Sequence, residues 1–166
     1  EPTAGSNGSS SPGLAHALDS GYHLTKGKTV FFGMSDTIMR PENVFDTLRR
    51  FAQPNDDVAL ALFPTERCEK FGMVETDGGG IVVKVVDKPK VTSLTHMWGC
   101  MMWRAAFTEH LRESVRVQGI GDFAQILNAA IGKGFRVRGV RFDGGTYQDL
   151  GTYEEIAELE RQIRQP

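Results

Sequence analysis

The sequence is poor in the features that mark several large classes of protein. Two of its 166 residues are cysteines, Cys68 and Cys100, which is too few for a disulfide framework or a metal knuckle. No apolar run approaches the roughly 20 residues that span a bilayer, and no secretory signal is recognisable. These absences predict a cytoplasmic protein in a reducing setting, with no membrane partner.

An excess of either charge is also lacking. The chain has 19 Lys and Arg residues against 21 Asp and Glu residues, for a net charge of −2. Because nucleic acids and anionic membranes are bound by basic surfaces, we expect neither as the main partner. There is no Walker phosphate loop and no G-x-S-x-G nucleophile motif, and the four histidines show no metal-ligand spacing.

What the sequence does contain is typical of a globular domain. Hydrophobic residues make up 40% and charged residues 24% of the chain, enough to build a core. The 19 glycines exceed the usual share of about 7% and follow no repeat, so we expect them at turns and close backbone approaches. Residues 1–13 are small, polar and turn-forming, which predicts a flexible loop or tail before the folded part, residues 14–166.

Short apolar runs predict an α/β fold. Residues 29–34 and 57–63 are continuous apolar runs, typical of strands buried on both faces. Between them Val44, Phe45, Leu48 and Phe51 share one face of a predicted helix. Because a strand, a helix and a strand follow one another, we predict a right-handed crossover and a mainly parallel, Rossmann-like sheet with helices on both faces.

The remaining segments complete this predicted fold. A weak helical stripe covers 14–24, and a Gly-rich turn predicts an inserted β-hairpin. Thr152 and Glu155 form a capping box that opens a last helix. The other expected elements are a hairpin with strands at 71–76 and 81–86, an apolar run at 98–103, helices at 107–115 and 123–131, and a half-exposed or edge strand at 136–142.

Two carboxylates stand where an α/β sheet binds ligands. Ligands lie beyond the carboxyl ends of the strands; Asp36 follows the first apolar run, and Asp149 stands at a strand-to-helix turn. Two converging carboxylates, with phosphate supplying further oxygens, are what Mg²⁺ requires. Alternatively, Asp36 only ends a strand and Asp149 only precedes a helix cap. The spacing alone leaves both interpretations open.

Lys88 and several glycines offer weaker signals. Lys88 precedes Pro89 at a strand end, where its ammonium would hold a phosphate or simply be an exposed charge. Gly72 and Gly99 stand at strand starts, as close-approach points for a ligand or as bulges. Gly13 opens a helix whose free N–H groups would meet a ligand.

The order of these segments is more specific than any one of them. PGLAHAL, VFFGMSD, FGMVETD with its Gly-rich turn, VVDKPK, WGCMMW and TYQDLGT follow one another along the chain. In this order they resemble the sugar-1-phosphate nucleotidylyltransferases, and within them the glucose-1-phosphate thymidylyltransferase and uridylyltransferase group. The resemblance covers nearly the whole chain, from about residue 12 to residue 159.

The resemblance implies an activity in nucleotide sugar biosynthesis and a role for each matching residue. The family transfers a nucleotidyl group from a nucleoside triphosphate, here dTTP or UTP, to a sugar 1-phosphate, with Mg²⁺ bridging phosphate oxygens and pyrophosphate leaving. Carried over, Asp36 and Asp149 bind the metal, and Lys88 contacts the sugar phosphate; these three are the implied catalytic residues. The implied substrate-binding residues are Asp87 for sugar hydroxyls, Gly72, Trp98 and Gly99 for the sugar pocket, and Gly13, Leu14 and Ala15 for the base and ribose.

The sequence departs from the family pattern in three ways. Asp87 stands where the family usually has Glu, and Trp98 is bulkier than the small residue expected before Gly99. The family's opening G-x-G-T-R-L loop and its later P-K lysine are absent. We therefore expect residues 14–166 to be the C-terminal portion of a single nucleotidyltransferase domain, inactive alone and with an apolar sheet edge that favours homo-oligomers.

Two alternatives remain open at this point. A non-catalytic nucleotide-sugar-binding or regulatory domain would tolerate the departures at Asp87 and Trp98. A glycosyltransferase of similar architecture is the weaker alternative, because such enzymes carry a D-x-D metal motif and the residues around Asp36 do not supply one.

Overall fold

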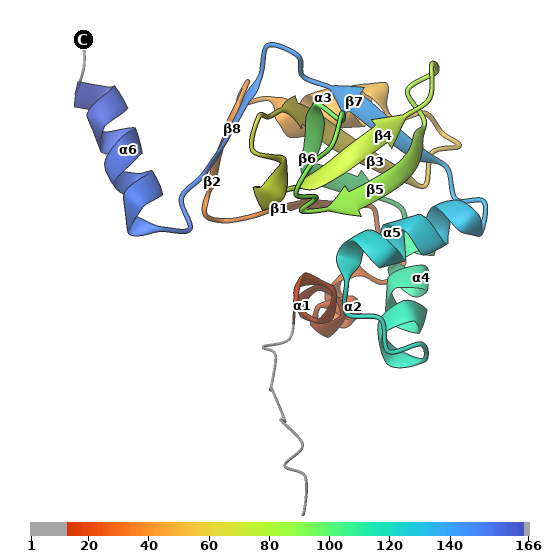
Figure 1. Ribbon diagram of the computed structural model, residues 1–166. Helices are drawn as coiled ribbons and strands as arrows, with labels where there is room; N and C mark the ends of the chain where they lie inside the picture. The colour runs from red at the N-terminus through yellow and green to blue at the C-terminus, as the bar shows by residue number, and fades with distance from the viewer. Residues whose placement is uncertain (1–12, 165–166) are drawn as a thin grey trace, which may run out of the picture.

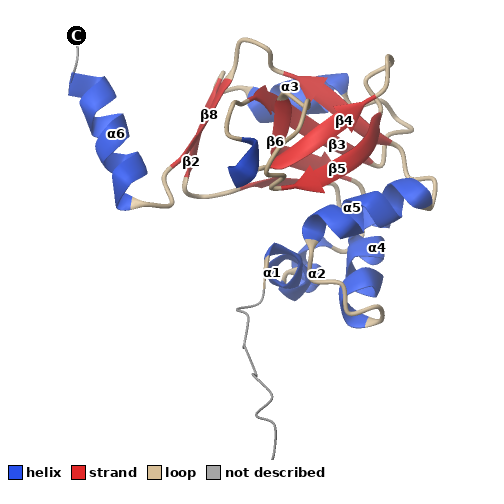
Figure 2. Cartoon of the chain, in the orientation of Figure 1, coloured by secondary structure: helices blue, strands red, loops and turns tan. Residues whose placement is uncertain are grey.

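The computed structural model describes residues 13–164, so the predicted tail lies almost wholly outside the described residues. A sheet with helices on both faces forms the body, and the last helix extends away from it (Figure 1, Figure 2). The helices are α1 (Leu14–Ser20), α2 (Tyr22–Thr25), α3 (Val44–Phe51), α4 (Ala105–Arg116), α5 (Phe123–Gly132) and α6 (Tyr153–Arg164), with a 3-10 turn at Cys68–Lys70. The strands are β1 (Val30–Gly33), β2 (Thr37–Arg40), β3 (Val58–Pro64), β4 (Gly72–Thr76), β5 (Val82–Asp87), β6 (His96–Trp103), β7 (Val137–Arg141) and β8 (Thr146–Asp149).

The main sheet is largely antiparallel, so the prediction of a mainly parallel sheet is wrong. Its strand order is β5-β4-β6-β3-β7, with β1 also paired to β6, and of these ladders only β3–β7 is parallel. β1 and β3 do run in the same direction, as the crossover requires. They do not pair, however, because β6 lies between them, antiparallel to both, and pairs with each through Cys100–Trp103. An apolar run carries no information about strand direction, so sequence alone could not place β6 there.

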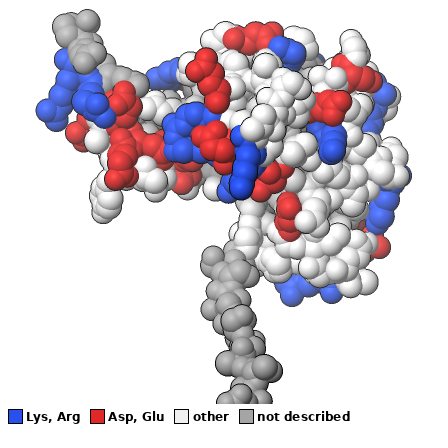
Figure 3. Space-filling model, viewed as in Figure 1, with Lys and Arg blue, Asp and Glu red and all other residues white. Residues whose placement is uncertain are grey.

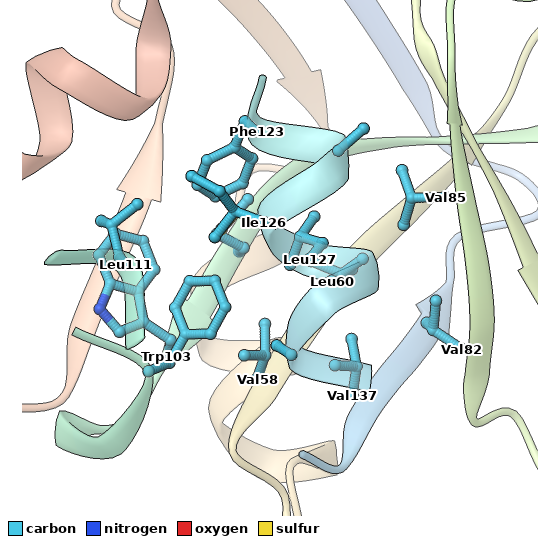
Figure 4. Close-up of a cluster of buried hydrophobic side chains, with 14 of the residues drawn as sticks. Val58, Leu60, Val82, Val85, Trp103, Leu111, Phe123, Ile126, Leu127 and Val137 are labelled. Carbon is cyan, nitrogen blue, oxygen red and sulfur yellow. The ribbon is translucent and has the colours of Figure 1, made fainter. Parts of the chain in front are cut away.

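Alternation along β3 divides the core into two layers. Val58, Leu60 and Leu62 face α4 and α5, and the residues between them face α3, as the two-residue period of a strand requires. Figure 4 shows the first layer, where Phe123, Ile126 and Leu127 of α5 lie over Val58 and Leu60 of β3. The prediction of an α/β fold with helices on both faces is confirmed.

Most predicted elements form, with shifted boundaries. The stripe at 14–24 becomes two helices, α1 and α2, divided at Gly21. The hairpin forms as β4 and β5, and Thr152 and Glu155 exchange the two hydrogen bonds of the capping box, each 3.2 Å long. Phe51, expected on the same face as Val44 and Leu48, is 61% exposed at the end of α3.

Two features at the edges of the body bear on the site. β2 and β8 form a separate two-stranded sheet. Within the described residues β1 pairs with β6 alone, and Phe31 and Met34 beside this free edge are 42% and 43% exposed. Among helices α1 to α6, none is both long and apolar enough to cross a membrane. The cytoplasmic location and the self-association stay predictions.

Candidate active site

A cavity of about 540 Å³ brings together segments from the whole length of the chain. It lies between the start of α1, the open end of the β4–β5 hairpin, the start of β6, the start of α5 and the end of β8. The predicted site residues that line it are Gly13, Leu14, Gly72, Asp87, Lys88, Trp98, Gly99 and Asp149. These residues, which were predicted separately along the sequence, therefore line one cavity, although the main sheet is largely antiparallel and not mainly parallel as expected.

The two predicted metal-binding carboxylates converge through β2 and β8. Thr37 pairs with Asp149 across these strands, and the Leu150 N–H donates to the Asp36 carbonyl oxygen at 2.8 Å. A Cβ placed on Gly151 would lie 3.4 Å from Asp149 Oδ1 and 3.7 Å from Asp36 Oδ2. Both carboxylates thus reach the same point, with Asp149 on the cavity wall and Asp36 exposed beside it.

This pair has the donor set that Mg²⁺ prefers. The Gly151 N–H donates to Asp149 Oδ1 at 3.2 Å, and no described residue donates a hydrogen bond to the Asp36 carboxylate. Within residues 13–164 no group of three or more His, Cys, Asp or Glu side chains is arranged to hold a metal. Two carboxylates with free oxygens suit an ion that takes one or two protein ligands and completes its shell with water and phosphate.

Lys88 lines the same cavity and has a strained backbone conformation. Its φ of 43° makes it the one residue other than glycine with a positive φ in the described part of the chain, and such strain is concentrated at functional sites. Its N–H donates to the Phe71 carbonyl oxygen at 3.0 Å, which fixes it at the end of β5. Its ammonium forms no ion pair with any residue in 13–164, so it is available to an anion.

The glycines that were expected to admit a ligand make room for the protein's own aromatic rings. A Cβ on Gly72 would lie 2.4 Å from Trp98 Nε1, and one on Gly99 would lie 2.5 Å from Tyr147 Cδ2. Gly99 is also a bulge, because β3 pairs Ala61 with Cys100 and Leu62 with Trp98, leaving Gly99 unpaired. Of the two interpretations of Gly99 left open by the sequence, the structure therefore shows the bulge, and the close approach is made by the Tyr147 ring.

The bulge at Gly99 decides where Trp98 lies. Without an extra residue, Trp98 and Cys100 would face the same side of the sheet. With it, Cys100 packs in the α3 layer while Trp98 turns to the α5 layer, its ring centroid 5.6 Å from that of Phe123. Trp98 therefore forms an apolar wall of the cavity beside Gly72. Ala15, by contrast, is fully buried in the core and does not line the cavity.

Tyr147 is a site residue that the sequence analysis missed. Burial raises the pKa of its phenol to about 12, and the nearby charges of Asp149 and Asp36 act in the same direction. The phenol therefore keeps its proton at neutral pH. The signal was present in TYQD, because alternation along a strand puts Tyr147 and Asp149 on the same face.

The other missed lining residues come from segments expected to be structural. Asp122 caps α5, accepting from the Ala124 N–H at 2.8 Å and the Gln125 N–H at 3.3 Å; its place before an apolar helical run was the available signal. Lys70 and Phe71 precede β4. The remaining lining residues that were missed are Met34, Met97, Phe123 and Ala124.

Comparisons with known structures agree with this architecture. The chain is similar to a protein described as a glucose-1-phosphate thymidylyltransferase from Bacillus anthracis, solved with a sucrose, at 17% identity and a TM-score of 0.75, over 100% of this chain and 64% of that one. It is also similar to the inositol-1-phosphate CTP transferase of T. maritima, at 15% identity and a TM-score of 0.70, over 93% and 63% of the two chains. An apo UDP-glucose pyrophosphorylase matches at 19% identity and a TM-score of 0.73, over 92% and 60%.

These likenesses establish the fold, and a family model adds the relationship. The chain spans less than two thirds of the length of each of these structural neighbours. No curated protein sequence matches it significantly. The family model described as nucleotidyl transferase, however, matches residues 3–166. The chain belongs to the nucleotidyl transferase family.

Proposed function

We propose that the protein transfers a nucleotidyl group from dTTP or UTP to a sugar 1-phosphate, giving a nucleotide sugar and pyrophosphate. The observation that carries the proposal is the convergence of Asp36 and Asp149 beside a cavity that both Asp149 and Lys88 line. Carboxylates for a divalent ion and a free ammonium for a phosphate are the two charges that such a reaction requires. The similar structures, named as nucleotidyltransferases and a pyrophosphorylase acting on phosphorylated substrates, support the substrate class.

The reaction needs positioning more than a nucleophilic side chain. An oxygen of the sugar phosphate attacks the α-phosphorus; the new P–O bond forms as the bond to the leaving pyrophosphate breaks. A bound Mg²⁺ would neutralise charge on the phosphate oxygens, and Asp36 and Asp149 would hold it. Lys88 would hold the sugar phosphate in line, while Tyr147, kept protonated, packs against Gly99 and fixes the direction of β8.

Other residues of the site would bind different parts of the substrates. Asp87 would accept hydrogen bonds from sugar hydroxyls, and the indole of Trp98 offers an apolar face to the sugar ring. Gly13 and Leu14, at the start of α1, would face the base and ribose. Ala15 would support this segment from the core.

The test is pyrophosphate release by the protein as its gene encodes it, with dTTP or UTP, glucose 1-phosphate and Mg²⁺. We expect Asp149→Asn to reduce turnover by at least about a hundredfold, because it removes a negative ligand of the metal. Gln148→Glu, on the neighbouring residue that points to the other side of β8, is the matched control and should keep activity. Unchanged turnover in Asp149→Asn would remove this residue from the metal site and with it the proposed mechanism.

A non-catalytic nucleotide-sugar-binding domain is the second candidate. It is favoured by Trp98, whose ring fills the space over Gly72, and by the short Asp87 carboxylate. It predicts binding of UDP-glucose or dTDP-glucose without pyrophosphate release, even when Mg²⁺ is present. Calorimetry with these ligands beside the turnover assay separates the two functions.

A further inference from the structure

Lys70 is a second lysine on the cavity wall, and it lies at the same end of the hairpin as Lys88. The 3-10 turn at Cys68–Lys70 leads directly into β4. Gly72 pairs with Asp87, and the Lys88 N–H donates to the Phe71 carbonyl oxygen, so the two lysines flank adjacent strand ends. Both line the 540 Å³ cavity.

The two lysines differ in their partners. Lys88 has no ion-pair partner among the described residues, whereas Lys70 Nζ lies 3.0 Å from Glu155 Oε1 on α6. The Arg67 guanidinium lies 3.6 Å from the same oxygen. Lys70 also lines a second cavity, of about 800 Å³, between α6 and the body. Figure 3 shows acidic and basic side chains intermixed on the side where α6 meets the body.

Glu155 is held in place more firmly than Lys70. Its Oε2 accepts from the Thr152 N–H in the capping box while its Oε1 contacts the lysine. Its side chain is 14% exposed, against 40% for that of Lys70. A lysine side chain with four carbons in its stem can leave such a pair for another anion, since an ion pair with a partly exposed lysine is weak.

The charges that line the cavity make a single free lysine a weak anchor for a dianion. Asp87, Asp122 and Asp149 contribute three carboxylates, and Lys70 and Lys88 are the two cations. A phosphate dianion bound at Lys88 alone would meet more negative than positive charge. Lys70 is the second cationic residue that lines the cavity, and it lies at the same end of the β4–β5 hairpin as Lys88.

We propose that Lys70 is a second phosphate-binding residue of this cavity and that Glu155 holds it at the rim as a competing counter-ion. The ligand class is a phosphate monoester dianion, and its identification as a sugar 1-phosphate rests on the proposed function. When the phosphate enters, Lys70 exchanges the Glu155 carboxylate for the phosphate oxygens. Glu155 is thus a positioning residue that lowers the affinity of the site until a ligand displaces it.

The test measures binding of glucose 1-phosphate, and of inorganic phosphate as the sugar-free probe, by calorimetry without nucleotide. Fluorescence of Trp98, on the cavity wall, locates the bound ligand, because the other tryptophan, Trp103, is buried in the core. We expect Lys70→Gln to weaken binding about fivefold to tenfold, as loss of a charge-assisted hydrogen bond does, and Lys70→Arg to retain most of it. Lys90→Gln, two residues beyond Lys88 and outside the cavity lining, is the matched control.

Glu155→Gln distinguishes a competing counter-ion from a structural contact. Glutamine preserves the capping box but not the charge, so this variant should bind either phosphate about threefold more tightly than the wild type. In Lys70→Gln/Glu155→Gln the gain should disappear. A Glu155→Gln variant that binds more weakly, or a gain that persists without Lys70, would overturn the proposal.

Failure of this inference and failure of the proposed function give different results. A wild type that binds neither probe, or a Lys70→Gln variant no weaker than Lys90→Gln, overturns the role of Lys70, whatever the turnover. If the variants follow the expected pattern but no pyrophosphate is released, the phosphate site stands and the transferase proposal falls. If turnover is present and Lys70→Gln leaves KM for the sugar phosphate unchanged, the transferase stands and this site falls.

Discussion

The centre of the main sheet and the edge that carries the cavity are held together by different forces. β3 and β6 lie between two apolar layers, and nearly all their side chains are buried. β2 and β8 pair only with each other in the described chain. Asp36, just before β2, and Asp87 and Lys88, at the end of β5, are exposed. Burial thus holds the main sheet in place, and we call this sheet, with the segments packed in its core, the frame. A few hydrogen bonds and the bulge at Gly99 position the site residues. Changes to the frame should lower the free energy of unfolding. Changes to the edge region, which is β2, β8, α6 and the segments that line the cavity, should lower activity first.

The largest effect on stability is expected at Asp56, where the frame contains a buried charge. Asp56 is fully buried just before β3 and accepts hydrogen bonds from Arg138 Nε at 2.5 Å, the Gln53 N–H at 2.7 Å and Arg136 Nε at 2.9 Å. It thereby joins the starts of the parallel strands β3 and β7. Asp56→Asn should cost about 3–5 kcal/mol of unfolding free energy at pH 7, because it leaves two arginines without their counter-ion.

The pH dependence of this loss has a definite sign. Burial alone would raise the pKa of Asp56, but the hydrogen bonds from Arg138, Gln53 and Arg136 outweigh it and hold the pKa below its ordinary value of 3.8. The stabilisation is therefore full above pH 3.8 and is lost as the pH falls through the lower folded value. Urea unfolding of Asp56→Asn and wild type should converge toward acid pH. Asp46→Asn, at an exposed ion pair on α3, should match the wild type throughout, and a gap for Asp56→Asn that does not narrow as the pH falls below 3.8 would contradict this account.

A smaller effect is expected where frame and site meet, at Gly99. A Cβ there would lie 2.5 Å from Tyr147 Cδ2 and 2.9 Å from Phe63 Cδ2, so Gly99→Ala must displace the Tyr147 ring. Overpacking of this kind costs about 1–3 kcal/mol. Because Tyr147 and Asp149 share one face of β8, turnover and Mg²⁺ affinity should fall by more than the stability loss explains.

Gly78→Ala is the matched control for Gly99→Ala. Gly78 lies in the turn of the hairpin with open space where its Cβ would be. Urea unfolding and the pyrophosphate assay on both variants provide the comparison. Equal, small losses in the two would show that Gly99 does not position the carboxylate edge.

The sequence predicts the buried strands of the frame better than it predicts how the residues of the site come together. The runs 57–63 and 98–103 are apolar because both faces of β3 and β6 are covered, so burial could be predicted from the pattern. The direction of β6 could not, because pairing depends on long-range geometry that an apolar run does not encode. At the site, the resemblance selected Asp36 and Asp149, and only the β2–β8 register brings them together. Lys70 was missed because its importance depends on Glu155, which lies far along the chain.

The smallest effect on stability is expected at the N-terminal cap of α6, formed by Thr152 and Glu155. This helix is exposed along most of its length, with Tyr153 and Ile163 89% and 75% exposed, so the core contributes little to it. Thr152→Ala removes the hydroxyl that accepts from the Glu155 N–H and should destabilise the helix by about 1 kcal/mol. Since a helix of 12 residues is marginal by itself, the loss should appear as reduced helicity by circular dichroism and faster amide exchange in α6. The midpoint of global unfolding should remain unchanged, because the sheet unfolds independently of this cap. Thr152→Ser, which keeps the hydroxyl, should restore both signals, and a shift of the global midpoint in Thr152→Ala would mean that α6 belongs to the frame after all.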